Sequence, residues 1–274
     1  MVGDPIRVDA EAVATTCAIT FEYDRRLRFM TLAPPIDDRE ALRLSRYSRA
    51  AGVAMLLSIV FGLLGEMILP ERIIVSKDAA ATAANILGDP TLFRLTFAAY
   101  LVEGLCDVAL CVIFYILLEP VDRNLALLSA FFGIASMITF AVAQSSFFAA
   151  SLVLGDTSGM ESFTTEQRNG LAYLAVRISG TIAGLFLCLY GTASMVRGYL
   201  MARSTYIPKI FGILFMLGGA GFFLRSATFL LVPKYSSPLL LMPMALAGIP
   251  LMLWLLFRGI RPARTTASRE PLRQ

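Results

Sequence analysis

The sequence contains no histidine among its 274 residues. Histidine-ligated haem, histidine zinc sites and histidine-dependent catalytic triads are therefore excluded for this chain alone. Four cysteines occur without any C-x-x-C spacing, at Cys17, Cys106, Cys111 and Cys188. Cys106 and Cys111 lie five positions apart, so on a helix they point in different directions, which argues against a disulfide or a clustered metal site. We predict no metal, no cofactor and no catalytic residue.

Charged residues are also scarce, at 16% of the chain, whereas 57% of the residues are hydrophobic. Soluble domains average about 25% charged and about 45 to 50% apolar residues, and a soluble core could not hide this much apolar side chain. The net charge is +4, and most basic residues lie in the tails and in particular loops. This distribution indicates membrane topology rather than nucleic-acid binding. We expect a multi-pass membrane protein with no nucleic-acid partner.

Long apolar runs dominate the rest of the chain. Six of them are long enough to cross a bilayer: 50–69, 93–118, 125–152, 171–195, 209–232 and 236–257. Segment 76–87 has a helix-capping residue and good helix formers but few large apolar side chains, which predicts a short external surface helix between the first two spans. The predicted fold class is all-α, a polytopic transmembrane bundle of six helices.

Polar termini flank the bundle. Residues 1–48 carry mixed charge and lack the apolar region of a signal peptide, so we expect a largely disordered extension, with Met30 as an alternative start to Met1. Residues 49–258 form the six-helix domain, and 259–274 form a basic tail. Lys and Arg gather on the side of both termini, which the positive-inside rule assigns to the cytoplasm. These residues are Arg43, Arg46, Arg49, Arg123, Arg197, Arg203, Lys209, Arg258, Arg261 and Arg264.

Seven charged residues fall inside the spans, of which Arg94 and Lys209 lie at span ends. We predict that the other five form one buried polar cluster: Glu66, Glu103, Asp107, Arg177 and Arg225. Glu103 and Asp107 are four positions apart, so they share one helix face near the middle of the second span. An unpaired charge at that depth is costly. We expect Glu103 to form ion pairs with the arginines and Asp107, which lies deeper, to be the functional carboxylate.

Several roles stay open for this cluster. Ion pairs that lock helices together need no ligand. Two arginines facing two carboxylates would also suit a site for a small or amphipathic anionic ligand, a secondary transporter or a proton-coupled carrier. The carboxylates could act on a lipid as general acid and base, but no nucleophile motif is present, so an enzyme is the less favoured class. Small-residue stripes would suit an accessory subunit that associates with another membrane protein.

Several motifs resemble those of a known bacterial membrane family. They include Asp78-Ala79-Ala80-Ala81-Thr82-Ala83-Ala84-Asn85-Ile86, Leu118-Glu119-Pro120-Val121-Asp122-Arg123-Asn124-Leu125-Ala126 and Gly198-Tyr199-Leu200. On these motifs the chain resembles domain-of-unknown-function family 4386 over roughly residues 46–260. The resemblance implies a multi-helix protein of the bacterial inner membrane, surrounded by lipids, with no established activity, cofactor or catalytic residue.

Overall fold

Six long apolar helices make up most of the protein. The computed structural model describes residues 38–155, 159–232 and 237–260, and within these ranges the chain has helices and no strand. Each of the six is long and apolar enough to cross a membrane. The predicted all-α, six-span fold is confirmed. The principal helices are α2 (Asp38–Gly62), α5 (Pro90–Leu118), α6 (Arg123–Gly155), α7 (Thr165–Arg203), α8 (Lys209–Leu231) and α9 (Met242–Phe257).

The first span contains a π-helical turn. After α2 the chain forms η1 (Leu63–Ile68) and then α3 (Leu69–Ile73), which carries Pro70 in its first turn. Proline has no amide hydrogen, and its ring would clash with the carbonyl four residues earlier in a regular helix. The amide of Leu69 instead donates to the carbonyl of Leu64, five residues back. The π-turn therefore lets the helical span continue through Pro70, and Glu66 is one of the residues of this turn.

A short helix, α4 (Ala79–Gly88), follows the first span at the predicted place. Oδ1 of Asp78 caps it by accepting a 2.8 Å hydrogen bond from the amide of Ala81. Its inner face is buried through Thr82, Ala83 and Ile86, and it packs against α6 and α7. This helix is thus part of the bundle and not an isolated surface segment.

The helical domain extends beyond the predicted boundaries at both ends. The helix of the first span begins at Asp38, inside the segment 1–48 that the sequence predicted to be largely disordered, because Leu44 and Ser48 pack into the bundle with 1% and 0% of their surfaces exposed. The amide of Ile260 donates to Oγ of Ser48 at 3.2 Å, so the start of the predicted tail is packed as well. Residues 1–37 and 261–274 lie outside the described ranges.

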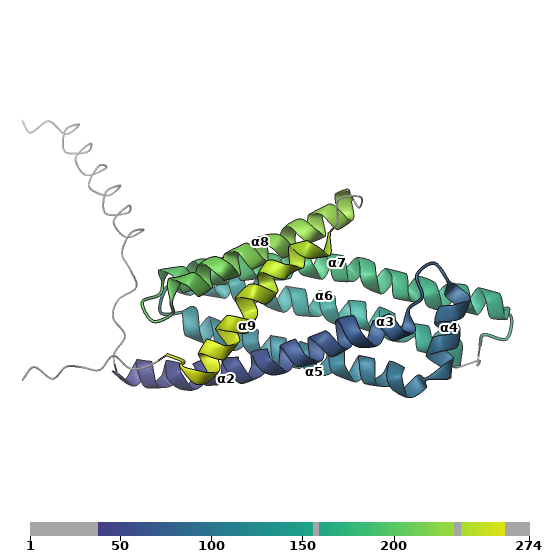
Figure 1. Cartoon of the computed structure of the whole chain (residues 1–274), viewed down its shortest axis with the longest axis horizontal. Helices are drawn as coiled ribbons and strands as arrows, with labels where there is room; N and C mark the ends of the chain where they lie inside the picture. Colours follow the sequence, from purple (N-terminus) through teal and green to yellow (C-terminus); the bar gives the residue numbers. More distant parts are fainter. Residues whose placement is uncertain (1–37, 156–158, 233–236, 261–274) are drawn as a thin grey trace, which may run out of the picture.

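The six spans form a closed ring. Each span packs on the one before it in sequence, and α9 closes the ring by packing on α2, as its crossing over α2 in Figure 1 illustrates. Two apolar clusters fill the ring. One includes Leu44, Leu117 and Leu251, and the other, near α4, includes Phe93 and Phe147. Tyr190 of α7 packs against both clusters and therefore marks their junction.

The contact between α7 and α8 rests on small residues at a spacing of seven. The matched pairs are Gly184 with Ser226, Gly191 with Gly219, and Gly198 with Gly212. A Cβ atom on Gly191 would come within 2.6 Å of the Gly219 carbonyl oxygen, so the two backbones touch directly. A seven-residue repeat is typical of helix pairs with a left-handed supercoil. This close antiparallel pair holds the α7 face that carries the candidate site.

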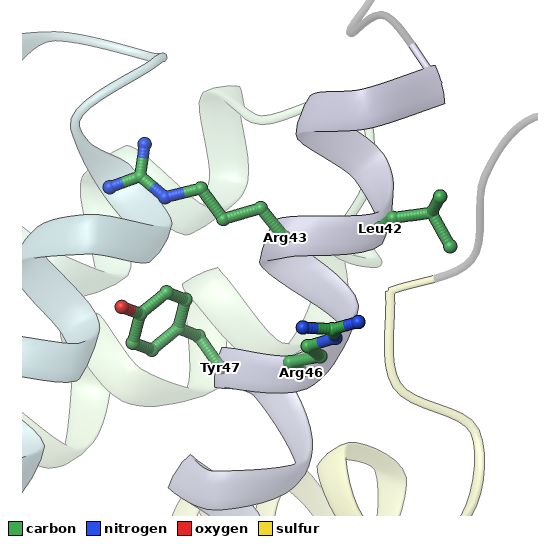
Figure 2. Close-up of a pocket in the computed structure, with 4 residues that line it drawn as sticks. All are labelled: Leu42, Arg43, Arg46 and Tyr47. Carbon is green, nitrogen blue, oxygen red and sulfur yellow. The ribbon is translucent and has the colours of Figure 1, made fainter.

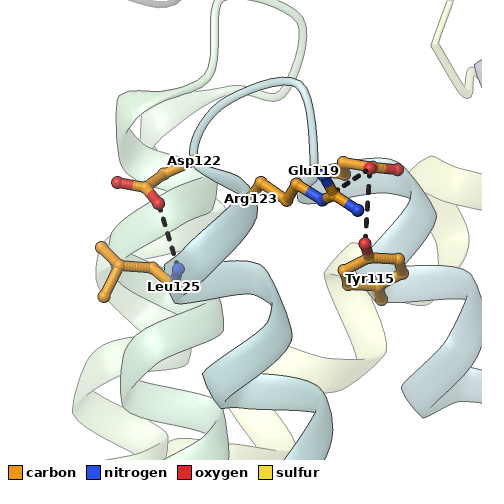
Figure 3. Close-up of polar contacts among 5 residues, drawn as sticks. All are labelled: Tyr115, Glu119, Asp122, Arg123 and Leu125. Carbon is orange, nitrogen blue, oxygen red and sulfur yellow. Dashed lines mark hydrogen bonds and ion pairs between the residues drawn. The ribbon is translucent and has the colours of Figure 1, made fainter.

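The turn from α5 to α6 is short and held by local polar contacts (Figure 3). Oδ1 of Asp122 accepts a 3.0 Å hydrogen bond from the amide of Leu125, which caps α6. Glu119 accepts a 3.3 Å hydrogen bond from the hydroxyl of Tyr115 and lies 3.6 Å from Nε of Arg123. These contacts fix α5 and α6 as antiparallel neighbours at the end of the bundle where α2 begins.

Candidate functional site

The carboxylates of α5 face small residues of α2. Three contacts follow one another along this interface: Ser58 with Asp107, Gly62 with Glu103, and Gly65 with Tyr100. Oγ of Ser58 donates a 2.8 Å hydrogen bond to Oδ1 of Asp107. A Cβ atom on Gly62 would lie 2.7 Å from Oε1 of Glu103, so only glycine leaves room for this carboxylate as placed. The first span and α5 therefore pack closely in an antiparallel register.

The positive charge that acts on Asp107 comes from Arg197 of α7. Arg197 is 2% exposed and Asp107 is 8% exposed. The charge of Arg197 acts on the Asp107 carboxylate, but no ion pair within 4 Å joins them in the described part of the chain. The guanidinium donates from Nε to Oγ of Ser129 at 3.1 Å and from Nη2 to Sγ of Cys111 at 3.3 Å. Arg197 is thus held by neutral partners, with its counter-charge further away.

Aromatic rings and a glycine complete the surroundings of Arg197. Its guanidinium carbon lies 5.5 Å from the ring centre of Phe114 and 5.9 Å from that of Tyr190. Such contacts stabilise a cation away from water. A Cβ atom on Gly133 would lie 2.5 Å from Nη2 of Arg197. Any larger residue at position 133 would occupy the space of the guanidinium.

The alignment of α7 with α8 places the guanidinium of Arg197 near the middle of the membrane span. The small-residue pairs of α7 and α8 bring Tyr190 level with Ala220, the central residue of α8. The 23 residues of α8 extend about 35 Å, close to the ~30 Å thickness of a hydrocarbon core. The arginine beside Tyr190 therefore lies deep in the bilayer region, where a charge is costly without a compensating group.

The sequence placed Arg197 among the cytoplasmic basic residues and outside the buried cluster. That expectation was wrong, because α7 continues to Arg203 and carries Arg197 into the core. A signal was present in the sequence. Arg197 lies seven positions after Tyr190, and residues at that spacing share one helix face.

The three carboxylates come together in a row of graded exposure. Glu66 on η1 is exposed, Glu103 is half-buried and Asp107 is buried. Glu103 interacts electrostatically with Glu66 and with Asp107, and Glu66 interacts with Asp107. Oε2 of Glu103 is buried and accepts no hydrogen bond from any described residue. We call Glu66, Glu103 and Asp107 the carboxylate row; it leads from the surface of the bundle to the neighbourhood of Arg197.

The two arginines that the sequence assigned to the cluster lie elsewhere. Arg177 is exposed, in a shallow groove on α7 with Leu174 and Thr181, and no described contact pairs it with a carboxylate. Arg225 is half-buried, with its guanidinium carbon 5.5 Å from the ring centre of Phe229. The charges that act on Glu103 are those of Glu66 and Asp107. No described contact joins Glu103 to Arg177, and the pairing of Glu103 with the two arginines stays a prediction; the arginine whose charge acts on Asp107 is Arg197.

The side chains of the site support few kinds of chemical reaction. Within residues 38–155, 159–232 and 237–260, no group of three or more acidic or thiol side chains has a geometry that could hold a metal ion. The row offers carboxylates that can bind protons or cations, and Arg197 offers a fixed positive charge next to the innermost one. Binding and release of a proton is the simplest reaction that these groups support.

A family model described as Domain of unknown function (DUF4386) matches residues 50–259, which is more than half of the chain. The chain belongs to this family. No curated protein and no solved structure matches it. The carboxylate row and Arg197 all lie inside the matched segment of this DUF4386 protein, so the buried charges belong to the family domain and not to the terminal extensions.

Proposed function

We propose that this DUF4386 protein is a proton-coupled membrane carrier in which the carboxylate row binds the proton and Arg197 controls its release from Asp107. The observation that carries the proposal is the graded row itself, which runs from exposed Glu66 to buried Asp107 beside a fully enclosed arginine. A carboxylate in lipid stays ionised only near a positive charge. A small displacement of Arg197 would therefore change the protonation of Asp107.

Two features of the row support proton binding. Three carboxylates that interact in a medium of low dielectric cannot all stay ionised without enough positive charge, so the row is expected to hold at least one proton. The unpartnered Oε2 of Glu103 has a lone pair open to such a proton. Glu103 would then exchange the proton between the exposed Glu66 and the buried Asp107.

A structural role is the second candidate, and the surroundings of Arg197 favour it. Hydrogen bonds to Ser129 and Cys111 and two aromatic rings already satisfy this guanidinium. A charge held in this way can join α5, α6 and α7 without any ligand. Direct binding of an anion is less well supported, because Arg197 is enclosed and Arg177 lies on the outer surface.

We also place the protein in the bacterial inner membrane with both termini in the cytoplasm. Basic residues gather at the end of the bundle where α2 begins, and fewer lie at the α4 end, as the positive-inside rule requires. The first end carries Arg43, Arg46, Arg49, Arg123, Arg203, Lys209 and Arg258, and the α4 end carries Arg72, Lys77, Arg94 and Arg168.

Infrared difference spectroscopy of the purified protein between two pH values tests the proposal. A proton-binding row predicts a carbonyl band of a buried carboxylic acid that responds to pH. The band should disappear in Asp107→Asn and weaken in Glu103→Gln. It should persist in Glu119→Gln, the matched change at the exposed end of α5.

Proteoliposomes with an internal pH dye provide the second measurement. Under an imposed membrane potential, the wild type should take up protons and Asp107→Asn should not. A purely structural Asp107–Arg197 pair would keep Asp107 ionised across the pH range of the measurement. The wild type would then show neither an acid band that Asp107→Asn removes nor proton uptake, and that result would count against a carrier.

A further inference from the structure

A separate cavity of about 430 Å³ lies on the first turns of α2, away from the carboxylate row. Its lining residues are Leu42, Arg43, Arg46 and Tyr47. Figure 2 shows Arg43 and Tyr47 extending to the same side of α2, with Leu42 on the opposite side. The guanidinium carbon of Arg43 lies 5.9 Å from the ring centre of Tyr47, which gives that arginine a defined position.

No ion pair with a described carboxylate balances the positive charge of this cavity. Arg43 and Arg46 are both exposed, and neither forms an ion pair with a carboxylate in the part of the chain that the structure describes. Arg46 is three positions from Arg43, so both guanidinium groups can reach the same side of the helix. Two uncompensated guanidinium groups beside an aromatic ring favour a bound anion.

The cavity lies at the level where the spans end. Continued along the helices, the antiparallel register of Gly62 with Glu103 brings Tyr47 level with Leu118, the last residue of α5. Beyond this level the chain turns between α5 and α6, held by the half-buried Glu119 and Asp122 and the exposed Arg123 (Figure 3). The cavity is therefore at the depth of lipid headgroups and not within the hydrocarbon core.

We infer that this cavity binds the phosphate of an anionic phospholipid headgroup. The planar fork of arginine matches phosphate oxygens, and basic pockets beside transmembrane helices suit anionic headgroups. Tyr47 provides the amphipathic ring that is typical of the membrane interface, and the 57% exposed Leu42 provides an apolar contact for the glycerol and acyl region. A zwitterionic headgroup is disfavoured, because its own cation would be brought close to two arginines.

Lipid titration of the full-length protein, followed by native mass spectrometry, tests this site. Phosphatidylglycerol should bind the wild type more tightly than phosphatidylcholine does. The double variant Arg43→Gln/Arg46→Gln should bind phosphatidylglycerol about thirtyfold more weakly, from ~1 kcal/mol for each basic residue near the surface. The matched control Arg49→Gln/Lys209→Gln removes two exposed charges from the same end but lies outside the cavity, and it should change binding by less than about threefold.

Each of the other possible results either supports or overturns the assignment of a lipid to this cavity. Equal binding of the two lipids by the wild type would overturn the inference, and so would an equal loss in the two double variants, since that result indicates diffuse attraction. Inorganic phosphate distinguishes the source of the anion. If phosphate alone displaces the lipid at equal concentration, the cavity is a site for a soluble anion and the lipid assignment is overturned; if the lipid stays bound, the assignment is supported.

Discussion

Oγ of Ser58 donates a 2.8 Å hydrogen bond to Oδ1 of Asp107 across the contact between α2 and α5. Among the described residues, Ser58 is thus the hydrogen-bond donor to Asp107, which has only 8% of its surface exposed. The first span is in this way connected to the buried charges of Asp107 and Arg197.

Ser58→Ala should destabilise the bundle. A hydrogen bond to a charged group contributes about 1.5 to 3 kcal/mol, and the buried oxygen of Asp107 would lose its partner. Denaturant unfolding in detergent micelles, monitored by circular dichroism, measures the free energy. Ser145→Ala is the control, because Ser145 is exposed, its hydroxyl bonds to the Ala141 carbonyl within its own helix, and its loss should change stability little. Equal stability of the two variants would show that the Ser58 contact contributes nothing.

Arg197→Met should lower the free energy of unfolding by about 3 to 5 kcal/mol, because it leaves a buried carboxylate without its positive charge. The double variant Arg197→Met/Asp107→Asn should recover a large part of this loss, since it removes both charges. The same unfolding assay gives the coupling free energy from a double-mutant cycle. Arg177→Met on the outer surface is the control. Additive losses in the cycle would mean that Arg197 and Asp107 do not interact.

Gly191→Ala should separate α7 from α8. The new Cβ would meet the carbonyl oxygen of Gly219 at 2.6 Å, and backbone atoms cannot move aside as a flexible side chain can. A loss of about 1 to 3 kcal/mol is expected in thermal unfolding. Gly180→Ala on the same helix meets no atom within 4 Å and should stabilise slightly through helix propensity. A loss at position 180 as large as at 191 would contradict the close contact of the two backbones.

Ser48→Ala should loosen the closure of the ring at α9. The amide of Ile260 would lose its 3.2 Å hydrogen bond to Oγ of Ser48 while the rest of α9 keeps its contacts. Hydrogen–deuterium exchange should rise in peptides that contain Gly259 and Ile260 and stay constant in α6. Unchanged exchange at Ile260 would show that other packing holds this end of the chain.

Parts of the candidate site were readable from the sequence. The spacing of Glu103 and Asp107 predicted two carboxylates on one face, and the structure places Glu103 against Gly62 and Asp107 against Ser58. The distribution of hydrophobic residues gave all six spans, because lipid demands about 20 consecutive apolar residues for each crossing. These properties depend on neighbours along one helix or on the helix as a whole.

The choice of partner for Asp107 was not readable in the same way. Arg177, Arg197 and Arg225 are similar as residues, and sequence position alone favoured the first and the last. The order of helices around the ring and the length of α7 bring Arg197 inward, whereas the face that Arg177 occupies points away from the bundle.

The amino-acid sequence by itself determined that this chain crosses the membrane six times, and that two carboxylates of one helix face the same way. Only the tertiary structure decided that Glu66, Glu103 and Asp107 form a row, and that Arg197 is the arginine beside it. The physical reason is that membrane crossing and helix periodicity are local properties, whereas the pairing of buried charges depends on which helix faces meet across the ring.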